Sequence, residues 1–141
     1  MTVESTIIQM AKAARRVSFE MAACPSRKKD EALLKIADAI LKKSGFIKEE
    51  NQKDLRLAEE TGMSKPMLDR LTIKDQTLVD MADGLKTIAA LPDPVGSTVK
   101  AWLRPNGLEV SKMRIPLGVI GIIYESRPNV TIDSAGLCLK A

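Results

Sequence analysis

The chain has 141 residues, of which 45% are hydrophobic and 28% charged, and its formal net charge is +4. That length suits one domain with a core, while the absence of histidine and the presence of only two cysteines argue against a metal site of the usual zinc type. Cations and anions are mixed along the chain and aromatic residues make up only 3% of it, so we expect no nucleic-acid partner. With no secretory leader and no apolar run near the ~20 residues that span a bilayer, we expect a cytoplasmic protein without a membrane partner.

The first half of the sequence predicts helices. Apolar residues at alternating three- and four-residue steps indicate one helix up to Pro25, and a second helix with Ser26 as its N-cap should follow and end at Ser44-Gly45. The apolar face of the first helix comprises Ile7, Met10, Ala14, Val17 and Met21. The face of the second comprises Leu33, Ile36, Ala37, Ile40 and Leu41.

The next helices differ in polarity. A mostly polar helix is predicted over residues 48–61, ending at Gly62, and it is followed by a short helical turn over 66–71. Thr72 and Asp75 form a capping-box pattern before a strongly apolar stripe, which the proline-rich stretch 92–94 ends. The polar helix offers a narrow buried face through Ile47, Leu55 and Ala58. The stripe comprises Leu78, Met81, Ala82, Leu85, Ile88 and Ala89.

Beyond residue 94 the pattern changes from helical to extended. Residues 98–104 and 108–114 flank a Pro-Asn-Gly turn and predict a β-hairpin. The apolar run 116–124 is typical of a strand buried on both faces, and it precedes a polar loop, 125–129, and an apolar helix over 130–141. One such strand makes no sheet, and its helix has nothing to pack against, so the sequence looks unfinished.

The loop 125–129 carries the candidate site. Ligands of open α/β sheets bind at the carboxyl ends of strands, where this loop lies. Arg127 could hold a phosphate or carboxylate, with Ser126 as a further candidate anion contact, and Asn129 could donate to an oxyanion. The alternative is that Arg127 is an ordinary exposed cation and Asn129 a helix N-cap. The residues alone leave both interpretations open.

The stretch Met113–Thr131 resembles the signature of the γ-glutamyl phosphate reductase family (glutamate-5-semialdehyde dehydrogenases), within the aldehyde dehydrogenase superfamily. Residues 132–141 are similar to the helix that follows the signature, and 91–96 and 51–54 also match. The resemblance covers essentially the whole chain.

The resemblance implies an α/β, aldehyde dehydrogenase-like fold, of which this chain is the N-terminal portion. Residues 1–94 would be the helical lead-in of the cofactor domain, 95–114 the hairpin of an oligomerisation arm, and 115–141 the first strand and helix of a Rossmann-like domain. The implied reaction is the NADPH-dependent reduction of L-glutamyl 5-phosphate to L-glutamate 5-semialdehyde with release of phosphate, in proline biosynthesis. The full-length enzyme is expected to be a homo-oligomer acting on this small-molecule substrate.

The resemblance also places the catalytic cysteine and most cofactor contacts beyond Ala141, so the chain alone is expected to be inactive. Cys24 and Cys138 are expected to be structural, with Cys138 a small core residue. Asn129 falls near the superfamily's oxyanion-hole asparagine. A rival hypothesis is a non-catalytic truncated paralogue that acts as a binding and assembly module through the hairpin 98–114.

Overall fold

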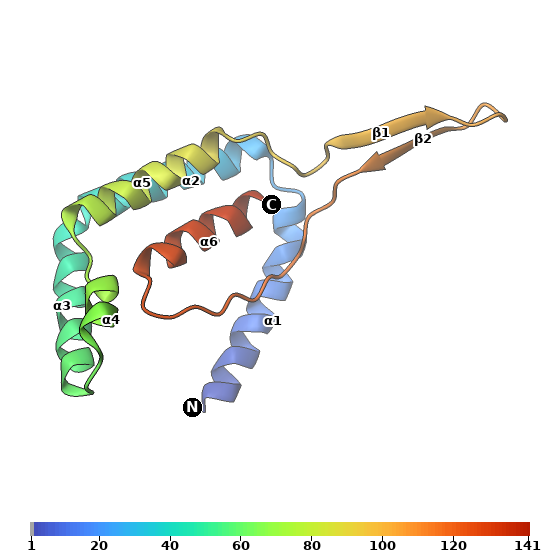
Figure 1. Ribbon diagram of the computed structural model, residues 1–141. Coiled ribbons are helices and arrows are strands. Elements are labelled where there is room, and N and C mark those ends of the chain that lie inside the picture. The colour runs from blue at the N-terminus through green and yellow to red at the C-terminus, as the bar shows by residue number, and fades with distance from the viewer. Residues whose placement is uncertain (1) are drawn as a thin grey trace.

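Residues 2–141, which the computed structural model describes, form six helices and one two-stranded sheet (Figure 1). This mixed α/β composition agrees with the predicted fold class. The helices are α1 (Val3–Ala22), α2 (Ser26–Lys42), α3 (Ser44–Glu60), α4 (Lys65–Leu71), α5 (Asp75–Ala90) and α6 (Pro128–Lys140). The strands are β1 (Thr98–Leu103) and β2 (Glu109–Met113), which lie between α5 and α6 in the chain.

The boundaries of α2 correct two predicted caps. The N-cap is Pro25 rather than Ser26, because proline already has the extended backbone that an N-cap requires (φ −61°, ψ 140°). At the other end, Lys43 alone separates α2 from α3, and Gly45 lies inside the first turn of α3. A single non-helical residue is enough to turn the chain here, so the glycine is not needed as a stop signal. Helix α3 therefore begins four residues earlier than predicted.

The region around α4 corrects a third cap. Thr72 ends α4, since its hydroxyl donates to the Leu68 carbonyl (2.8 Å), and α5 begins after Lys74. The buried side chain of Asn51 joins α3 to this connection. It donates to the Leu71 carbonyl (2.9 Å) and accepts from the Ile73 N–H (2.8 Å), which satisfies two backbone groups that helical bonding leaves free.

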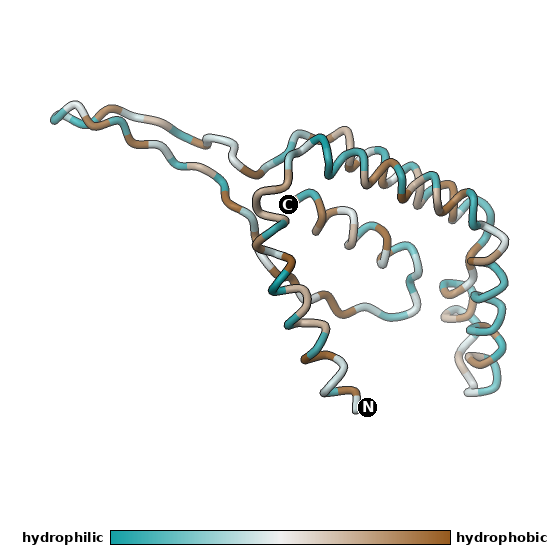
Figure 2. Tube along the Cα trace, turned by 180° about the vertical axis from the view of Figure 1, so that it is seen from behind, coloured by the Kyte–Doolittle hydropathy of each residue, from teal (hydrophilic) through white to brown (hydrophobic). Residues whose placement is uncertain are grey.

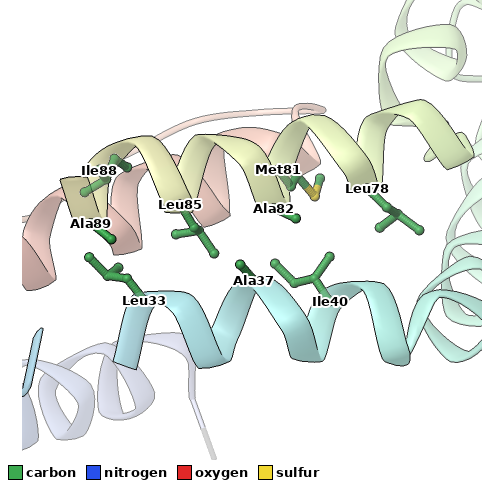
Figure 3. Close-up of a cluster of buried hydrophobic side chains, with 9 residues drawn as sticks. All are labelled: Leu33, Ala37, Ile40, Leu78, Met81, Ala82, Leu85, Ile88 and Ala89. Atoms are coloured by element: carbon green, nitrogen blue, oxygen red, sulfur yellow. The ribbon is translucent and has the colours of Figure 1, made fainter. Parts of the chain in front are cut away.

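The core lies between α2 and α5, which run side by side (Figures 1 and 3). All six residues of the predicted α5 stripe are buried, so that prediction is confirmed. The face of α2 is narrower than predicted, because Ile36 and Leu41 are 41% and 38% exposed. The buried cluster comprises Leu33, Ala37, Ile40, Leu78, Met81, Ala82, Leu85, Ile88 and Ala89.

Helix α6 packs on α5 and α2, which corrects the expectation that it has nothing to pack against. Gly136 makes the close approach possible. A Cβ at this position would lie 2.8 Å from Cδ2 of Leu85 and 3.0 Å from Cδ1 of Ile88, so both core side chains would have to shift. The helix thus completes a three-helix core without any sheet. It begins at Pro128, two residues before the predicted start.

The predicted hairpin is present and extends away from the helices (Figure 1). β1 and β2 are antiparallel, with Trp102 opposite Val110 and an irregularity in register between Thr98 and Lys100. Gly107 has φ +83°, a conformation that favours glycine and closes the turn. Residues of both strands are exposed on both faces, apart from half-buried Val110.

The apolar run 116–124 is extended but forms no strand, because no other segment among residues 2–141 pairs with it. The prediction of a strand buried on both faces is therefore wrong for these residues. Leu117 is 73% exposed and Ile123 fully exposed. Figure 2 shows the apolar character of this segment as it passes between α1 and α6.

Candidate functional site

The candidate site residues lie where the extended segment meets α6. Arg127 is the N-cap of α6 and Pro128 its first residue, so Asn129 lies inside the first turn. The alternative interpretation of Asn129 as the N-cap is therefore wrong by two residues. Proline suits this position because it lacks the N–H that a first helical residue leaves unbonded. Because they lie within four positions of one another, Ser126, Arg127 and Asn129 meet at the N-terminal end of the 13-residue helix α6.

Ser126 has an unusual backbone conformation. Its φ is +46°, and it is the one non-glycine residue among 2–141 with positive φ. A side chain in the left-handed region raises the energy of the backbone, and such residues cluster at binding and catalytic sites. Ser126 is half-buried, whereas Arg127 and Asn129 on either side of Pro128 are exposed. The chain reverses sharply at Ser126 before α6 begins.

The charges at this end of α6 favour an anion. The N–H groups of the first turn carry the positive end of the helix dipole, and the guanidinium of Arg127 adds a full positive charge. Within residues 2–141, the Arg127 side chain takes part in no ion pair, so its donors remain available to a ligand. The arrangement can bind a phosphate or carboxylate and can donate hydrogen bonds from Asn129.

A side-chain hydrogen bond closes the loop. The hydroxyls of Tyr124 and Thr131 are 2.6 Å apart, one at the end of the extended segment and the other in α6. The bond spans the six residues between them, which include all three candidate residues. The sequence pointed to the loop 125–129 but did not predict this contact across it.

A second polar cluster, which we call the lysine latch, comprises Lys29, Asp30, Asp93 and Lys140. The ammonium of Lys29 lies 3.0 Å from a carboxylate oxygen of Asp93 and donates to the Lys140 carbonyl (3.2 Å), at the end of α6. Lys140 in turn donates to the Ala89 carbonyl (3.0 Å), near the end of α5, and pairs with Asp30. The latch therefore ties α6 to α2, to α5 and to the start of the hairpin connection.

Both lysines of the latch are 4% exposed. Lysine is rarely buried this deeply unless it is paired. In the latch, Asp93 neutralises Lys29 and Asp30 neutralises Lys140. Sequence reasoning missed it. Lys29 stands in a run of basic residues that reads as a solvated surface, and nothing local distinguishes it from Lys28.

The surroundings of Asp93 favour the ionised form of its carboxyl group. Burial alone would raise the pKa of its carboxyl, but hydrogen bonds from the Val95 N–H (2.9 Å) and from the Ser26 hydroxyl outweigh burial. The ammonium of Lys29 adds to them, so the pKa of Asp93 lies below its ordinary value of 3.8. The carboxylate is thus a fixed negative partner for Lys29 at neutral pH.

An apolar groove of about 320 Å³ lies away from the candidate residues, between α1, the extended segment and α6. Its lining includes Val17, Val119 and Cys138, but none of Ser126, Arg127 and Asn129. Cys138 is exposed, which corrects its assignment as a core residue, because the face of α6 that carries it points away from α5. Cys24 is half-buried at the turn between α1 and α2.

Residues 2–141 contain neither a membrane-spanning helix nor a cluster of metal ligands. None of the helices there combines the length and the apolarity that crossing a membrane requires. The same residues contain no group of three or more cysteine, aspartate and glutamate side chains arranged to hold a metal ion.

Comparison with known proteins identifies the family. The chain is 57% identical over all 141 residues to the γ-glutamyl phosphate reductase of Desulfatibacillum aliphaticivorans and 52% identical to that of Geotalea daltonii. The chain is thus a homologue of γ-glutamyl phosphate reductases. It spans about a third of the length of these relatives, 34% in each case, and matches their N-terminal part. No protein-family model matches it.

Solved structures of γ-glutamyl phosphate reductases have the same fold over this part. The Thermotoga maritima enzyme superposes with a TM-score of 0.90 at 37% sequence identity, over 94% of this chain and 32% of that one. The Saccharomyces cerevisiae enzyme gives a TM-score of 0.87 at 34% identity, over 94% and 34%. The resemblance drawn from the signature is thereby confirmed, together with the fold class.

Proposed function

We propose that the complete protein is an NADPH-dependent reductase of proline biosynthesis that converts L-glutamyl 5-phosphate into L-glutamate 5-semialdehyde and phosphate in the cytoplasm. The observation that carries the proposal is the match of the whole chain, at 57% identity, to a γ-glutamyl phosphate reductase. The anion-binding end of α6 supports it, since the substrate bears a phosphate and an α-carboxylate.

We assign roles to three residues of the loop. Arg127 contacts an anionic group of the substrate, because its guanidinium is exposed and unpaired among residues 2–141. Ser126 assists it with its hydroxyl. Asn129 donates a hydrogen bond to the oxygen that becomes negative when a nucleophile attacks the acyl carbon, which stabilises the transition state.

The nucleophile and the cofactor site belong to the rest of the protein. A cysteine thiolate that attacks the acyl carbon and expels phosphate has to come from outside residues 2–141, since Cys24 and Cys138 lie away from the loop. Gly118 and Gly121 stand in an extended segment and form no phosphate-binding turn before a helix. Residues 2–141 therefore offer no glycine-rich phosphate-binding turn for a dinucleotide, and we expect this chain alone to be inactive.

The function is tested on the complete protein in the reverse direction. Purified protein is mixed with L-glutamate 5-semialdehyde, phosphate and NADP, and the formation of NADPH is followed at its absorption band. We expect phosphate-dependent reduction of NADP, and none with the 141-residue chain. An absence of turnover by the complete, folded protein in both directions would refute the proposal.

Variants of the complete protein test the individual roles. Asn129→Ala should lower kcat by roughly two to three orders of magnitude if Asn129 is an oxyanion donor, and near-normal turnover would remove the assignment. Arg127→Ala should raise the KM for phosphate. An unchanged KM would show that Arg127 is an ordinary surface cation. Arg56→Ala, exposed in α3 and outside both the loop and the hairpin, serves as the control for loss of one positive charge.

We propose further that the domain division follows the resemblance: a helical lead-in over 1–94, an assembly arm over 95–114, and the first strand and helix of the cofactor domain over 115–141. In the complete protein, the exposed run 116–124 pairs with strands that this chain does not contain. Its extended backbone and its apolar side chains suit that role.

The hairpin supports assembly into a homo-oligomer. Val99, Leu103 and Met113 are each more than half exposed, and no other strand among residues 2–141 pairs with either edge of the hairpin. Open strand edges with apolar side chains can recruit a strand from another copy. The same observation favours the second candidate function, a non-catalytic assembly module that pairs with full-length subunits.

Size-exclusion chromatography with light scattering separates these candidates. The complete protein should elute as an oligomer, and Leu103→Lys should lower its mass towards that of a monomer while leaving the helical circular dichroism signal unchanged. If the 141-residue chain co-elutes with the complete protein but the complete protein has no reductase activity, the assembly module is the better description. A monomeric complete protein would exclude the arm.

A further inference from the structure

The Tyr124–Thr131 hydrogen bond, which we call the loop clasp, encloses a strained loop. Between its two hydroxyls, 2.6 Å apart, lie the left-handed Ser126 and the exposed Arg127. One further bond stabilises the loop from inside, from the Val130 N–H to the Arg127 carbonyl (3.0 Å). A residue held at positive φ keeps that conformation only if its surroundings impose it.

The two ends of the clasp are anchored very differently. Thr131 belongs to α6, which Gly136 packs against α5 and the lysine latch holds at Lys140. Tyr124 ends the extended segment, whose neighbouring residue Ile123 is fully exposed. The clasp is therefore a direct link between the packed helix and the end of the extended segment, and it fixes the distance that the loop has to span.

We propose that Tyr124 and Thr131 are positioning residues, which hold Arg127 and Asn129 in the orientation needed to bind the anionic substrate. This inference rests on the proposed function. Neither hydroxyl has to touch the substrate, since each already has the other as its partner. A loop fixed in advance loses less conformational entropy on binding, so the clasp acts on affinity and orientation.

The test uses isosteric variants of the complete protein: Tyr124→Phe, Thr131→Val and the double variant. Each single variant should raise the KM for phosphate, in the reverse direction, about three- to tenfold, the worth of one hydrogen bond, with the KM for NADP unchanged. The double variant should be no worse than either single one, because both remove the same bond. Thr131→Ser retains a hydroxyl and should restore near-normal values.

Thr87→Val is the matched control, because the Thr87 hydroxyl also forms one exposed hydrogen bond (2.9 Å, to the Asp83 carbonyl) but lies in α5, outside the loop. It should leave both KM values unchanged. A loss confined to Tyr124→Phe would show that the phenol contacts the substrate itself. That result, additive losses in the double variant, or unchanged kinetics in both single variants would overturn the proposal.

Hydrogen–deuterium exchange gives a readout that does not depend on activity. The peptide that covers residues 125–131 should exchange faster in Tyr124→Phe and in Thr131→Val than in the wild type, while peptides from α5 stay unchanged. Equal exchange would refute the clasp even in an active enzyme. Faster exchange in the two variants of a complete protein whose wild type lacks reductase activity would support the clasp and refute only the proposed function.

Discussion

The helical core and the stretch 115–127 of the same chain contrast in how they are held. In α2 and α5, Leu33 and Leu85 are 0% and 1% exposed, and the lysine latch compensates the buried charges beside them. In the stretch 115–127, Ile123 is fully exposed, and the loop clasp is the side-chain hydrogen bond that ties the stretch to α6. The core is thus buried by its own helices, whereas the apolar side chains of the stretch remain exposed.

The difference shows that a region buries its apolar side chains only if the segments that cover them belong to the same stretch of sequence. The residues that form the core all lie within 26–140, so the packing of α2, α5 and α6 completes it. The apolar segment requires neighbouring strands, and residues 2–141 supply none beside it. An exposed run of this kind favours association, so we expect the isolated chain to be partly molten or prone to aggregate. A sharp, cooperative melt of a soluble monomer would contradict this.

The largest expected effect comes from breaking the lysine latch. Lys29→Met leaves the carboxylate of Asp93, which is 9% exposed, without its ammonium partner. We expect a loss of about 3–5 kcal/mol in the free energy of unfolding, as for other broken buried pairs. Urea denaturation of the complete protein measures it.

The control for the latch is Lys86→Met, which removes a surface ion pair with Asp83 whose side chains are 47% and 62% exposed. Its cost should be below about 1 kcal/mol. Equal losses in the two variants would mean that the latch is no more than a surface pair.

The second effect separates the two regions directly. Leu85→Ala should destabilise the complete protein by roughly 2–5 kcal/mol, because it leaves a cavity in the core. Ile123→Ala should cost under about 0.5 kcal/mol if the side chain stays as exposed as it is in this structure. It should cost several times more if added strands of the complete protein cover it. Denaturant titration of the complete protein decides, and a loss under about 0.5 kcal/mol would refute burial of this segment.

The third effect concerns the strained loop. Glycine adopts a φ of +46° without cost, so Ser126→Gly keeps the loop conformation, while Ser126→Ala keeps the strain and loses the hydroxyl. If the hydroxyl contacts the anion, both variants should raise the KM for phosphate about tenfold, as loss of one charged hydrogen bond would. If only the backbone conformation matters, neither variant should change it by more than about twofold. Steady-state kinetics of the complete protein distinguish the two roles.

The smallest effect is a dependence of stability on pH. The folded-state pKa of Asp93 lies below the ordinary 3.8, so its ionisation stabilises the fold above that pH. This stabilisation should be complete at neutral pH and should decline as pH falls below about 4 and through the lowered pKa. Asp93→Asn should flatten that decline. Unfolding free energies measured between pH 3 and pH 6 test it, and parallel curves for the two proteins would exclude a contribution from Asp93.

Patterns with local causes were predicted well from the sequence. The stripe of α5 is buried as its spacing indicates, and Pro92 and Pro94 follow directly after the helix ends. The hairpin and its Gly107 turn are confirmed, because turn chemistry is a property of a few consecutive residues. Cap positions were predicted less accurately, since several neighbouring residues can cap a helix and packing selects among them.

The candidate site was predicted only in part. The sequence pointed to Ser126, Arg127 and Asn129 as neighbours in one loop, and the structure adds the strain at Ser126 and the clasp that encloses it. The clasp joins residues seven positions apart through a turn whose geometry no periodicity encodes. The anion-binding role of the candidate site remains a prediction for the complete protein.

By itself, the sequence determined the helices, the hairpin and the resemblance to γ-glutamyl phosphate reductases, because helical spacing, turn residues and the signature before Thr131 are read along the chain. Only the tertiary structure decided that Lys29 and Lys140 are buried partners, 111 positions apart, and that α6 docks through Gly136. The physical reason is that burial and charge pairing depend on which distant residues meet in space. A lysine in a basic run carries no local mark of the aspartate that will neutralise it.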